Sequence, residues 1–181
     1  LQLWNFDGLD LDWEYPAAPN HNGNNNQATP EDKKNFALFL KEARIEFDKY
    51  NLLLTAAVGV GEKVVKDGYD MTAMNKYLDY IGLMTYDLHG SWDSTTGHNA
   101  PLYSNDKLNV HWSVENWING GVDPKKLILG IASYGRSFTL KNENNHNIGA
   151  EVIGGGEAGE YTKAPGFLAY YEILDILKNK N

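Results

Sequence analysis

The segment that decides the fold runs from residue 6 to residue 16 and reads FDGLDLDWEYP. Apolar and acidic side chains alternate in it, which is the two-residue period of a β-strand. One side of that strand would carry Leu9, Leu11 and Trp13, and the other side Asp10, Asp12 and Glu14. We therefore expect a strand over residues 6–15, with its indole in the core and its three carboxylates together.

Three carboxylates on one side of a strand predict acid–base chemistry. Like charges a few ångströms apart raise one another's pKa values, so at least one group should hold a proton near neutral pH. A protonated carboxylic acid beside an ionised one is the pairing that general acid catalysis at a glycosidic oxygen requires. In parallel α/β folds the carboxyl ends of the strands face the active site, and Glu14 is the last of the three acids before Pro16.

Two other interpretations of the same acids stay open at this point. Asp10, Asp12 and Glu14 could supply oxygen ligands to a hard cation, although a calcium loop has polar residues between its acids, and here Leu and Trp stand there. The acids could also belong to an ordinary solvated strand face. Spacing alone does not decide between these interpretations and catalysis.

Further strand and helix patterns alternate along the chain. Short apolar runs over residues 52–58, 80–86 and 127–134 predict three more buried strands. A helix should begin at Thr29, as the N-cap, with Pro30 in the first helical position and Asp32 in the capping-box position. Its apolar face would be formed by Phe36, Phe39, Leu40, Ala43 and Phe47.

Three other helices are predicted, over residues 70–78, 107–119 and 168–177. The second carries Trp112 and Trp117 as core residues and ends at Gly120-Gly121. Residues 21–27 form a polar Asn- and Gly-rich loop. Apolar strands separated by helices favour a parallel sheet covered on both faces.

The amino-acid composition argues against several classes of function. The chain has 181 residues, 24 of them acidic and 16 basic, so its net charge is −8. An acidic chain without a basic cluster argues against a nucleic-acid partner, because phosphate binding depends on Lys and Arg. No apolar run is long enough to span a membrane. There is no cysteine, and no histidine spacing typical of a metal site.

The chain places its main motif close to its first residue, which is not Met. We therefore expect it to be part of a longer natural protein. No pattern in the sequence specifies an oligomeric state.

Residues 6–16 resemble the signature of the family 18 glycoside hydrolases, whose pattern is D-G-x-D-x-D-x-E, with every fixed position filled. Three further segments resemble this family in the expected order. They are Met84–Asp87 with its continuation to Trp92, Thr96–Tyr103, and Tyr134–Phe138. The resemblance implies an α/β fold, a (β/α)8 TIM barrel of which the chain holds about strands 4 to 7. Residues 1–138 would be a partial catalytic domain, and residues 139–181 the start of an inserted α+β domain.

The resemblance also implies roles for the acids. Glu14 would be the general acid and then the base. Asp12 would orient the substrate's N-acetyl group, whose carbonyl oxygen acts as the nucleophile, and Asp10 would tune Asp12. Asp7 would support the turn or have a purely structural role. Tyr86 would donate a hydrogen bond to the acetamide carbonyl.

The remaining site residues are expected to bind substrate. By resemblance, Met84 and Asp87 would line the cleft, and so would Tyr134 and Arg136, although Arg136 could equally be an ion-pair residue. Trp92 follows a strand end in a Gly/Ser loop, where an indole can stack on the apolar face of a sugar.

The function implied is that of a retaining endochitinase, a secreted enzyme that cleaves β-1,4-linked N-acetylglucosamine polymers without a metal or other cofactor. Chitin or its oligosaccharides would be the partner, with no nucleic acid and no membrane. Two alternatives are a chitin-binding lectin on the same fold and a truncated, inactive product. The lectins of this family typically lose the acid at the position of Glu14, which is present here.

Overall fold

A computed structural model describes residues 1–17 and 28–179 of the chain. The loop predicted over residues 21–27 lies outside the described residues. The fold consists of two compact units. Unit 1 holds residues 1–84 and 111–130, and unit 2 holds residues 85–110 and 131–181. The predicted boundary near residue 138 stays a prediction.

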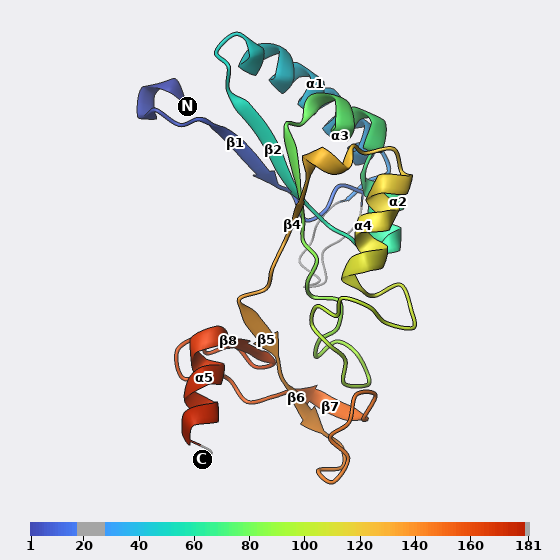
Figure 1. The fold of residues 1–181 in the computed structure, drawn as a ribbon, viewed down its shortest axis with the longest axis vertical. Helices are drawn as coiled ribbons and strands as arrows, with labels where there is room; N and C mark the ends of the chain where they lie inside the picture. The colour runs from blue at the N-terminus through green and yellow to red at the C-terminus, as the bar shows by residue number, and fades with distance from the viewer. Residues whose placement is uncertain (18–27, 180–181) are drawn as a thin grey trace. The chain divides into compact units, whose positions relative to one another are not determined.

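Unit 1 is a four-stranded parallel sheet with helices (Figure 1). Its strands are adjacent in the order β1 (Gly8–Asp12), β2 (Leu53–Val58), β3 (Tyr80–Leu83) and β4 (Leu127–Leu129). The connecting helices are α1 (Glu31–Asp48), α2 (Glu62–Gly68), α3 (Met71–Tyr77) and α4 (Val110–Asn119), and two short 3-10 helices are η1 (Gln2–Trp4) and η2 (Pro124–Lys126). Strands in chain order, joined by helices, are the repeating arrangement of a (β/α)8 barrel.

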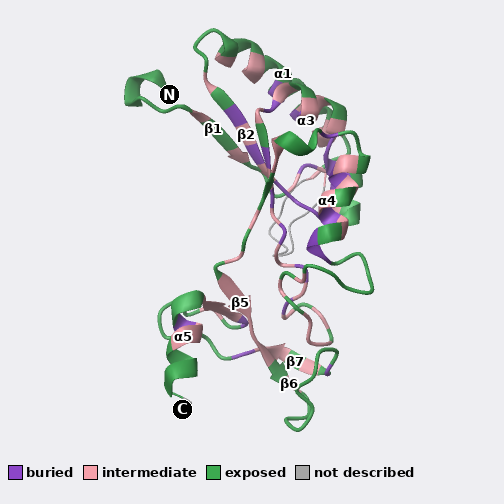
Figure 2. Cartoon of the chain, viewed as in Figure 1, coloured by how far each residue is buried: buried purple, intermediate pink, exposed green. Residues whose placement is uncertain are grey.

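The helices cover one face of this sheet. Alternate residues of β2 and β3 are buried on that face: Leu54, Ala56, Val58, Ile81 and Leu83. Figure 2 accordingly draws parts of β2 in purple. In the register, Asp10 pairs with Thr55, and Asp12 pairs with Ala57. These residues lie on the opposite face, which no described helix of unit 1 covers.

The expectation of a sheet covered on both faces is therefore wrong for the described residues. In a closed barrel the second face points inward and is covered by side chains from the other strands. Four strands cannot close in this way, so Asp10 and Asp12 are exposed. The fourth strand is also not buried as predicted. Ile128 and Leu129 are 50% and 49% exposed, because β4 is the edge of the sheet.

Helix α1 begins one residue later than predicted, at Glu31. Asp32 makes the capping interaction, because its carboxylate accepts hydrogen bonds from the Thr29 N–H at 2.9 Å and the Thr29 hydroxyl at 2.9 Å. Phe36 and Leu40 are buried, as the helical spacing predicts. Phe39 is 47% exposed, so its assignment to the apolar face is wrong.

The other predicted helices of unit 1 are present, but their bounds differ from the predicted ones. Helix α3 begins after Asp70, whose side chain accepts the Ala73 N–H. Helix α4 begins at Val110, three residues after the predicted start, and Trp117 is fully buried. The sequence did not predict α2. Trp13 is 37% exposed, so it only borders the core, packing edge-on against Phe36 with ring centroids 5.6 Å apart.

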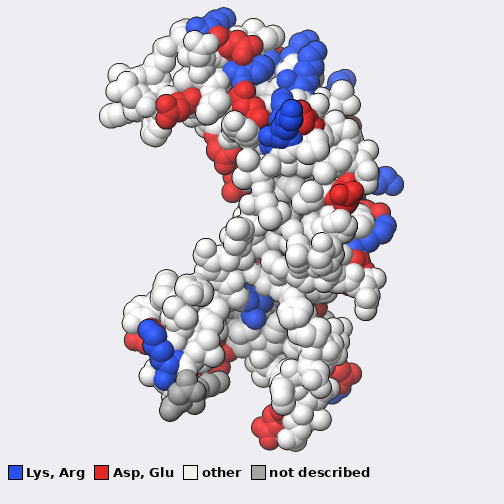
Figure 3. Space-filling view, viewed as in Figure 1, with Lys and Arg blue, Asp and Glu red and all other residues white. Residues whose placement is uncertain are grey.

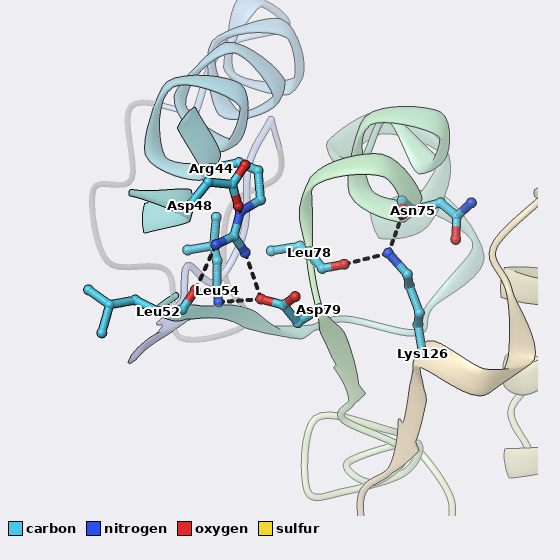
Figure 4. A network of polar contacts seen from close by, with 8 residues as sticks. All are labelled: Arg44, Asp48, Leu52, Leu54, Asn75, Leu78, Asp79 and Lys126. Carbon is cyan, nitrogen blue, oxygen red and sulfur yellow. Dashed lines mark hydrogen bonds and ion pairs between the residues drawn. The ribbon is translucent and has the colours of Figure 1, made fainter. Parts of the chain in front are cut away.

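A polar network joins the amino ends of β2 and β3 to α1 (Figure 4). Asp79 accepts hydrogen bonds from Arg44 and from the Leu54 N–H, both at 2.7 Å. Arg44 also donates to the Leu52 carbonyl oxygen at 2.6 Å. Lys126 extends the network to the end of α3 by donating to the carbonyl oxygens of Asn75 and Leu78. These bonds hold the amino ends of the strands in place, at the edge of the sheet opposite the carboxyl ends of the strands.

Unit 2 contains two small antiparallel pairs and a helix. Strand β5 (Tyr134–Arg136) pairs with β8 (Phe167–Ala169), and β6 (Phe138–Leu140) pairs with β7 (Val152–Gly155). Helix α5 (Tyr170–Asn179) follows β8 directly. Near its start, the Glu172 carboxylate is buried and accepts the backbone N–H groups of Tyr161, Thr162 and Ala169.

Charged side chains of both signs mix on the surface, and basic ones gather around α1 and α3 (Figure 3). A shallow groove between these helices is lined by Lys33, Lys34 and Lys41, with Asp70 among its residues. In the described part of the chain, no helix is long and apolar enough to cross a membrane.

Candidate active site

Two predicted acids lie on the open face of β1. Asp10 and Asp12 are two residues apart in the strand, so their side chains share that face. Asp10 Oδ1 accepts a hydrogen bond from the Thr55 hydroxyl at 2.5 Å. This bond holds Asp10 against β2, while Asp12 lies nearer the carboxyl end of β1.

Glu14 follows two residues after β1 ends, so the strand is shorter than predicted. Its side chain is exposed, and the Glu14–Tyr15 peptide bond is cis. Burial, together with the charges of Glu14 and Asp12, raises the pKa of the Tyr69 hydroxyl. The prediction that one of the three acids holds a proton stays a prediction.

Two other predicted residues of unit 1 contribute backbone contacts. The Asp7 carbonyl oxygen accepts the Leu53 N–H at 2.9 Å, which extends the pairing of β1 with β2, and the Asp7 side chain is exposed. Met84 follows β3, and its N–H donates to the Val58 carbonyl oxygen at 3.0 Å. Met84 therefore lies at the carboxyl end of the sheet, the end at which Glu14 also lies.

The remaining predicted residues gather around Asp87 in unit 2. Three donors reach one carboxylate oxygen, Asp87 Oδ1. They are the Tyr134 hydroxyl at 2.6 Å, Arg136 Nε at 2.8 Å and Arg136 Nη2 at 2.5 Å. The Asp87 side chain is 37% exposed. Burial and the hydrogen bond to Asp87 raise the pKa of Tyr134, so its hydroxyl stays a donor through neutral pH.

Aromatic rings enclose the Arg136 guanidinium. Its central carbon lies 5.0 Å from the ring centre of Trp92, 5.3 Å from Tyr134 and 5.5 Å from Phe167. Such cation–π contacts attract the guanidinium to the ring faces. Trp92 remains 45% exposed, so part of the indole is available to a ligand. Tyr86 meets Tyr134 edge-on, with centroids 6.0 Å apart.

Asn99 belongs to this group, although no role was predicted for it from the sequence. Asp87 has a left-handed backbone conformation, with φ of 56°, which costs energy for a residue with a Cβ. The Asn99 side chain accepts the Asp87 N–H at 2.9 Å, and its backbone carbonyl accepts the Leu88 N–H at 3.0 Å. Asn99 therefore holds the turn that presents Asp87.

Sequence reasoning also missed Thr55 and Phe167. Thr55 could have been found from the strand register, since it is polar in the otherwise apolar run over residues 52–58. Phe167 had no local signal, because its role comes from the pairing of β5 with β8 across a long loop.

The predicted site residues thus form two groups, one in each unit. In unit 1, Asp10 and Asp12 lie on β1 and Glu14 lies two residues past its end. In unit 2, ring contacts and hydrogen bonds join Tyr86, Asp87, Trp92, Tyr134 and Arg136. The joint roles predicted for Asp12 and Tyr86 stay predictions. Among residues 1–17 and 28–179, no group of three or more His, Cys, Asp or Glu side chains is placed to hold a metal ion.

A family model and known chitinases are similar to this chain over nearly all of its residues. The family model described as glycosyl hydrolases family 18 matches residues 1–181. Probable chitinase 2 of Drosophila melanogaster is 43% identical over 182 residues, which cover 99% of this chain and 36% of that protein. The chain therefore spans about a third of the length of this curated relative.

Solved structures are similar over nearly the whole chain. The Group IV chitinase of Ostrinia furnacalis in complex with allosamidin matches with a TM-score of 0.92 and 41% identity, covering 98% of this chain and 49% of that one. A human pseudo-chitinase with retained chitooligosaccharide binding matches with a TM-score of 0.87 and 36% identity, covering 98% of this chain and 50% of that one.

The parallel sheet with acids near the carboxyl end of its first strand, the match over every residue and the agreement with solved chitinase structures support one assignment. The fold is part of a TIM barrel. The chain belongs to family 18 of the glycosyl hydrolases.

Proposed function

We propose that the protein carrying this chain is a retaining chitinase that hydrolyses β-1,4 linkages between N-acetylglucosamine units. The observation that carries the proposal is the acidic group Asp10, Asp12 and Glu14 at the carboxyl end of a parallel strand, in a chain of family 18. A chitinase relative with bound allosamidin supports a carbohydrate ligand.

Glu14 transfers the protons in this mechanism. It gives a proton to the glycosidic oxygen as the bond from that oxygen to the anomeric carbon breaks. The substrate's own acetamide oxygen bonds to the anomeric carbon at the same time, so no carboxylate nucleophile is needed. Glu14 then takes a proton from water, whose oxygen displaces the acetamide. Two displacements at one carbon retain its configuration.

Asp12 and Asp10 support the internal nucleophile. Asp12 accepts the acetamide N–H, which orients the group and stabilises the positive charge that develops on it. Asp10 acts on Asp12 from the same strand face. The Thr55 hydroxyl donates a short hydrogen bond to Asp10. This bond supports a role for Asp10 in holding Asp12 rather than in contacting the substrate, because it anchors Asp10, the acid farther from Glu14.

The residues of unit 2 bind and position the sugar. Tyr86 donates a hydrogen bond to the acetamide oxygen and holds it in a near-attack position. Asp87 binds sugar hydroxyls through its second oxygen, since the hydrogen bonds from Tyr134 and Arg136 both end on Oδ1. Trp92 stacks on a sugar face, and Met84 of unit 1 lines the cleft.

Endo-type cleavage and an extracellular location belong to the same proposal and rest on family resemblance. The lectin alternative is not favoured, because Glu14, Asp12 and Tyr86 are all present. The domain division at residue 138 and a supporting role for Asp7 are also part of the proposal.

The anomeric form of the first product tests the mechanism. Chitotetraose is incubated with the full-length natural protein, and the products are followed by proton NMR before mutarotation. We expect the β-anomer to form first. An initial α-anomer would contradict a retaining, substrate-assisted mechanism, and an absence of any product would contradict the proposed hydrolysis.

A further inference from the structure

The two residues after Glu14 are packed tightly against glycines. Tyr15 lies against Gly59, which follows β2, because a Cβ atom placed on Gly59 would come within 2.9 Å of the Tyr15 ring. Pro16 is fully buried. A Cβ atom on Gly68, the last residue of α2, would lie 2.6 Å from the Pro16 carbonyl oxygen. A larger residue at Gly59 would displace the side chains of Val64 and Tyr15, and a larger residue at Gly68 would displace the backbone of Pro16.

A buried hydroxyl connects these contacts. Tyr69 comes directly after Gly68 and is 2% exposed. Its hydroxyl accepts the Gly59 N–H at 3.0 Å. Its ring packs against Phe36, with centroids 6.4 Å apart, and against Trp117, with centroids 5.4 Å apart. The hydroxyl is therefore fixed by the core on one side and by a backbone bond on the other.

The residue before Glu14 is held by the same group of rings. Trp13 packs edge-on against Phe36, the ring that also contacts Tyr69. Both neighbours of Glu14 are thus anchored, while the Glu14 side chain itself is exposed. The charges of Glu14 and Asp12 also contribute to the raised pKa of the Tyr69 hydroxyl.

We propose that Gly59, Gly68 and Tyr69 form a seat for residues 14–16, called here the Glu14 seat, and that they are positioning residues for proton transfer by Glu14. The inference rests on the proposed function of Glu14. A general acid must lie within hydrogen-bond reach of the proton acceptor. A displacement of about 1 Å can lower the rate about 100-fold, so a rigid seat has a direct effect on catalysis.

The test compares two alanine variants of the full-length natural protein. Gly68→Ala forces Pro16 to move. Gly61→Ala is the matched control, because a Cβ atom on Gly61 meets nothing within 4 Å and its φ of −61° suits alanine. With chitotetraose as substrate, we expect Gly68→Ala to lower kcat about 10- to 100-fold, with KM within about twofold. A change in the chemical step alone is what a misplaced acid produces.

Tyr69→Phe keeps the test decisive if Gly68→Ala does not fold. It retains the ring and its packing and removes only the hydroxyl that accepts the Gly59 N–H. We expect kcat to fall about 3- to 10-fold with KM unchanged, a loss on the scale of one hydrogen bond. If Tyr69→Phe, and Gly68→Ala where it folds, keep the kcat of Gly61→Ala, the seat has no positioning role and the proposal is wrong.

Glu14→Gln separates this failure from a failure of the proposed function. If Glu14→Gln abolishes hydrolysis while the seat variants are fully active, Glu14 keeps its role and only the seat is rejected. If Glu14→Gln is as active as the natural protein, the proposed function itself fails.

Discussion

The hydroxyl of Tyr134 lies 2.6 Å from Oδ1 of Asp87, the carboxylate oxygen that Arg136 also contacts. Tyr134→Phe removes this donor and leaves Asp87 freer to turn. A hydrogen bond to a charged group contributes about 1.5–3 kcal/mol, so we expect kcat/KM for chitotetraose to fall about 10-fold. Tyr161→Phe, a change at an exposed tyrosine of the same unit, is the control. Equal kcat/KM values for the two variants would contradict the role of Tyr134.

Trp92 gives a second prediction about substrate binding. Its indole is 45% exposed and lies over Arg136. Trp92→Ala removes the indole that we propose stacks on a sugar, and burial of a large apolar side chain is worth about 1.5–3 kcal/mol. We expect KM for chitotetraose to rise about 10-fold, with Trp92→Phe keeping most of the affinity. A KM for Trp92→Ala within about twofold of the natural value would show that the indole does not stack on substrate.

The sequence predicted the unit 1 sheet well because its signals are local. Period-two alternation marked β1, and short apolar runs marked β2 and β3. The helix start at Thr29 was correct to within one residue, because the capping interaction with Asp32 involves residues three apart. The apolar pattern did not predict which individual side chains are buried. Phe39 and Leu129 are exposed. Exposure depends on which neighbouring elements cover a face, and the type of a residue does not specify those neighbours.

The candidate site was predictable in parts. Family resemblance selected Asp87, Tyr134 and Arg136, and the structure brings these three into contact. It could not reveal that Asn99 holds Asp87 in a left-handed turn, because that contact joins residues 12 apart through a loop. The glycines under Tyr15 and Pro16 were also missed. Only tertiary packing distinguishes Gly59 and Gly68 from Gly61, which has open space around it.

Glu172 predicts a pH dependence for the stability of unit 2. Burial opposes its charge, but hydrogen bonds from Thr162, Ala169 and Tyr161 outweigh burial and lower the pKa from 4.5 to about 2. Because the folded-state pKa is the lower one, the carboxylate stabilises the fold above its ordinary pKa. This contribution is lost as the pH falls from about 4.5 toward about 2.

Thermal unfolding between about pH 2 and about pH 6 checks this prediction. We expect Glu172→Gln to be less stable than the natural protein near neutral pH, and the difference to shrink as the pH falls through the range given above. Glu160→Gln, at an exposed position, should show no such trend. A difference for Glu172→Gln that stays constant across this pH range would contradict the assignment.

The Arg44–Asp79 network predicts the effect of a change at the other end of the sheet. Asp79→Ala leaves the Leu54 N–H without this acceptor and removes one partner of Arg44, whose side chain is 15% exposed. We expect a loss of about 1–3 kcal/mol in the free energy of unfolding.

Glu46→Ala is the control for this variant. It removes an exposed ion pair with Lys49 and should cost about 0–1 kcal/mol. Both values come from denaturant unfolding of the full-length protein. An Asp79→Ala variant no less stable than Glu46→Ala would show that the network does not support the sheet.

The assignment of Glu14 as the proton donor is tested most directly by hydrolysis and binding measured on the same variant. Glu14→Gln keeps the size of the side chain and removes the transferable proton, and Glu115→Gln, at an exposed position on α4, is the control. In the full-length protein, we predict that Glu14→Gln abolishes hydrolysis of chitotetraose and still binds it, while Glu115→Gln is fully active. Hydrolysis by Glu14→Gln at the natural rate would contradict the account.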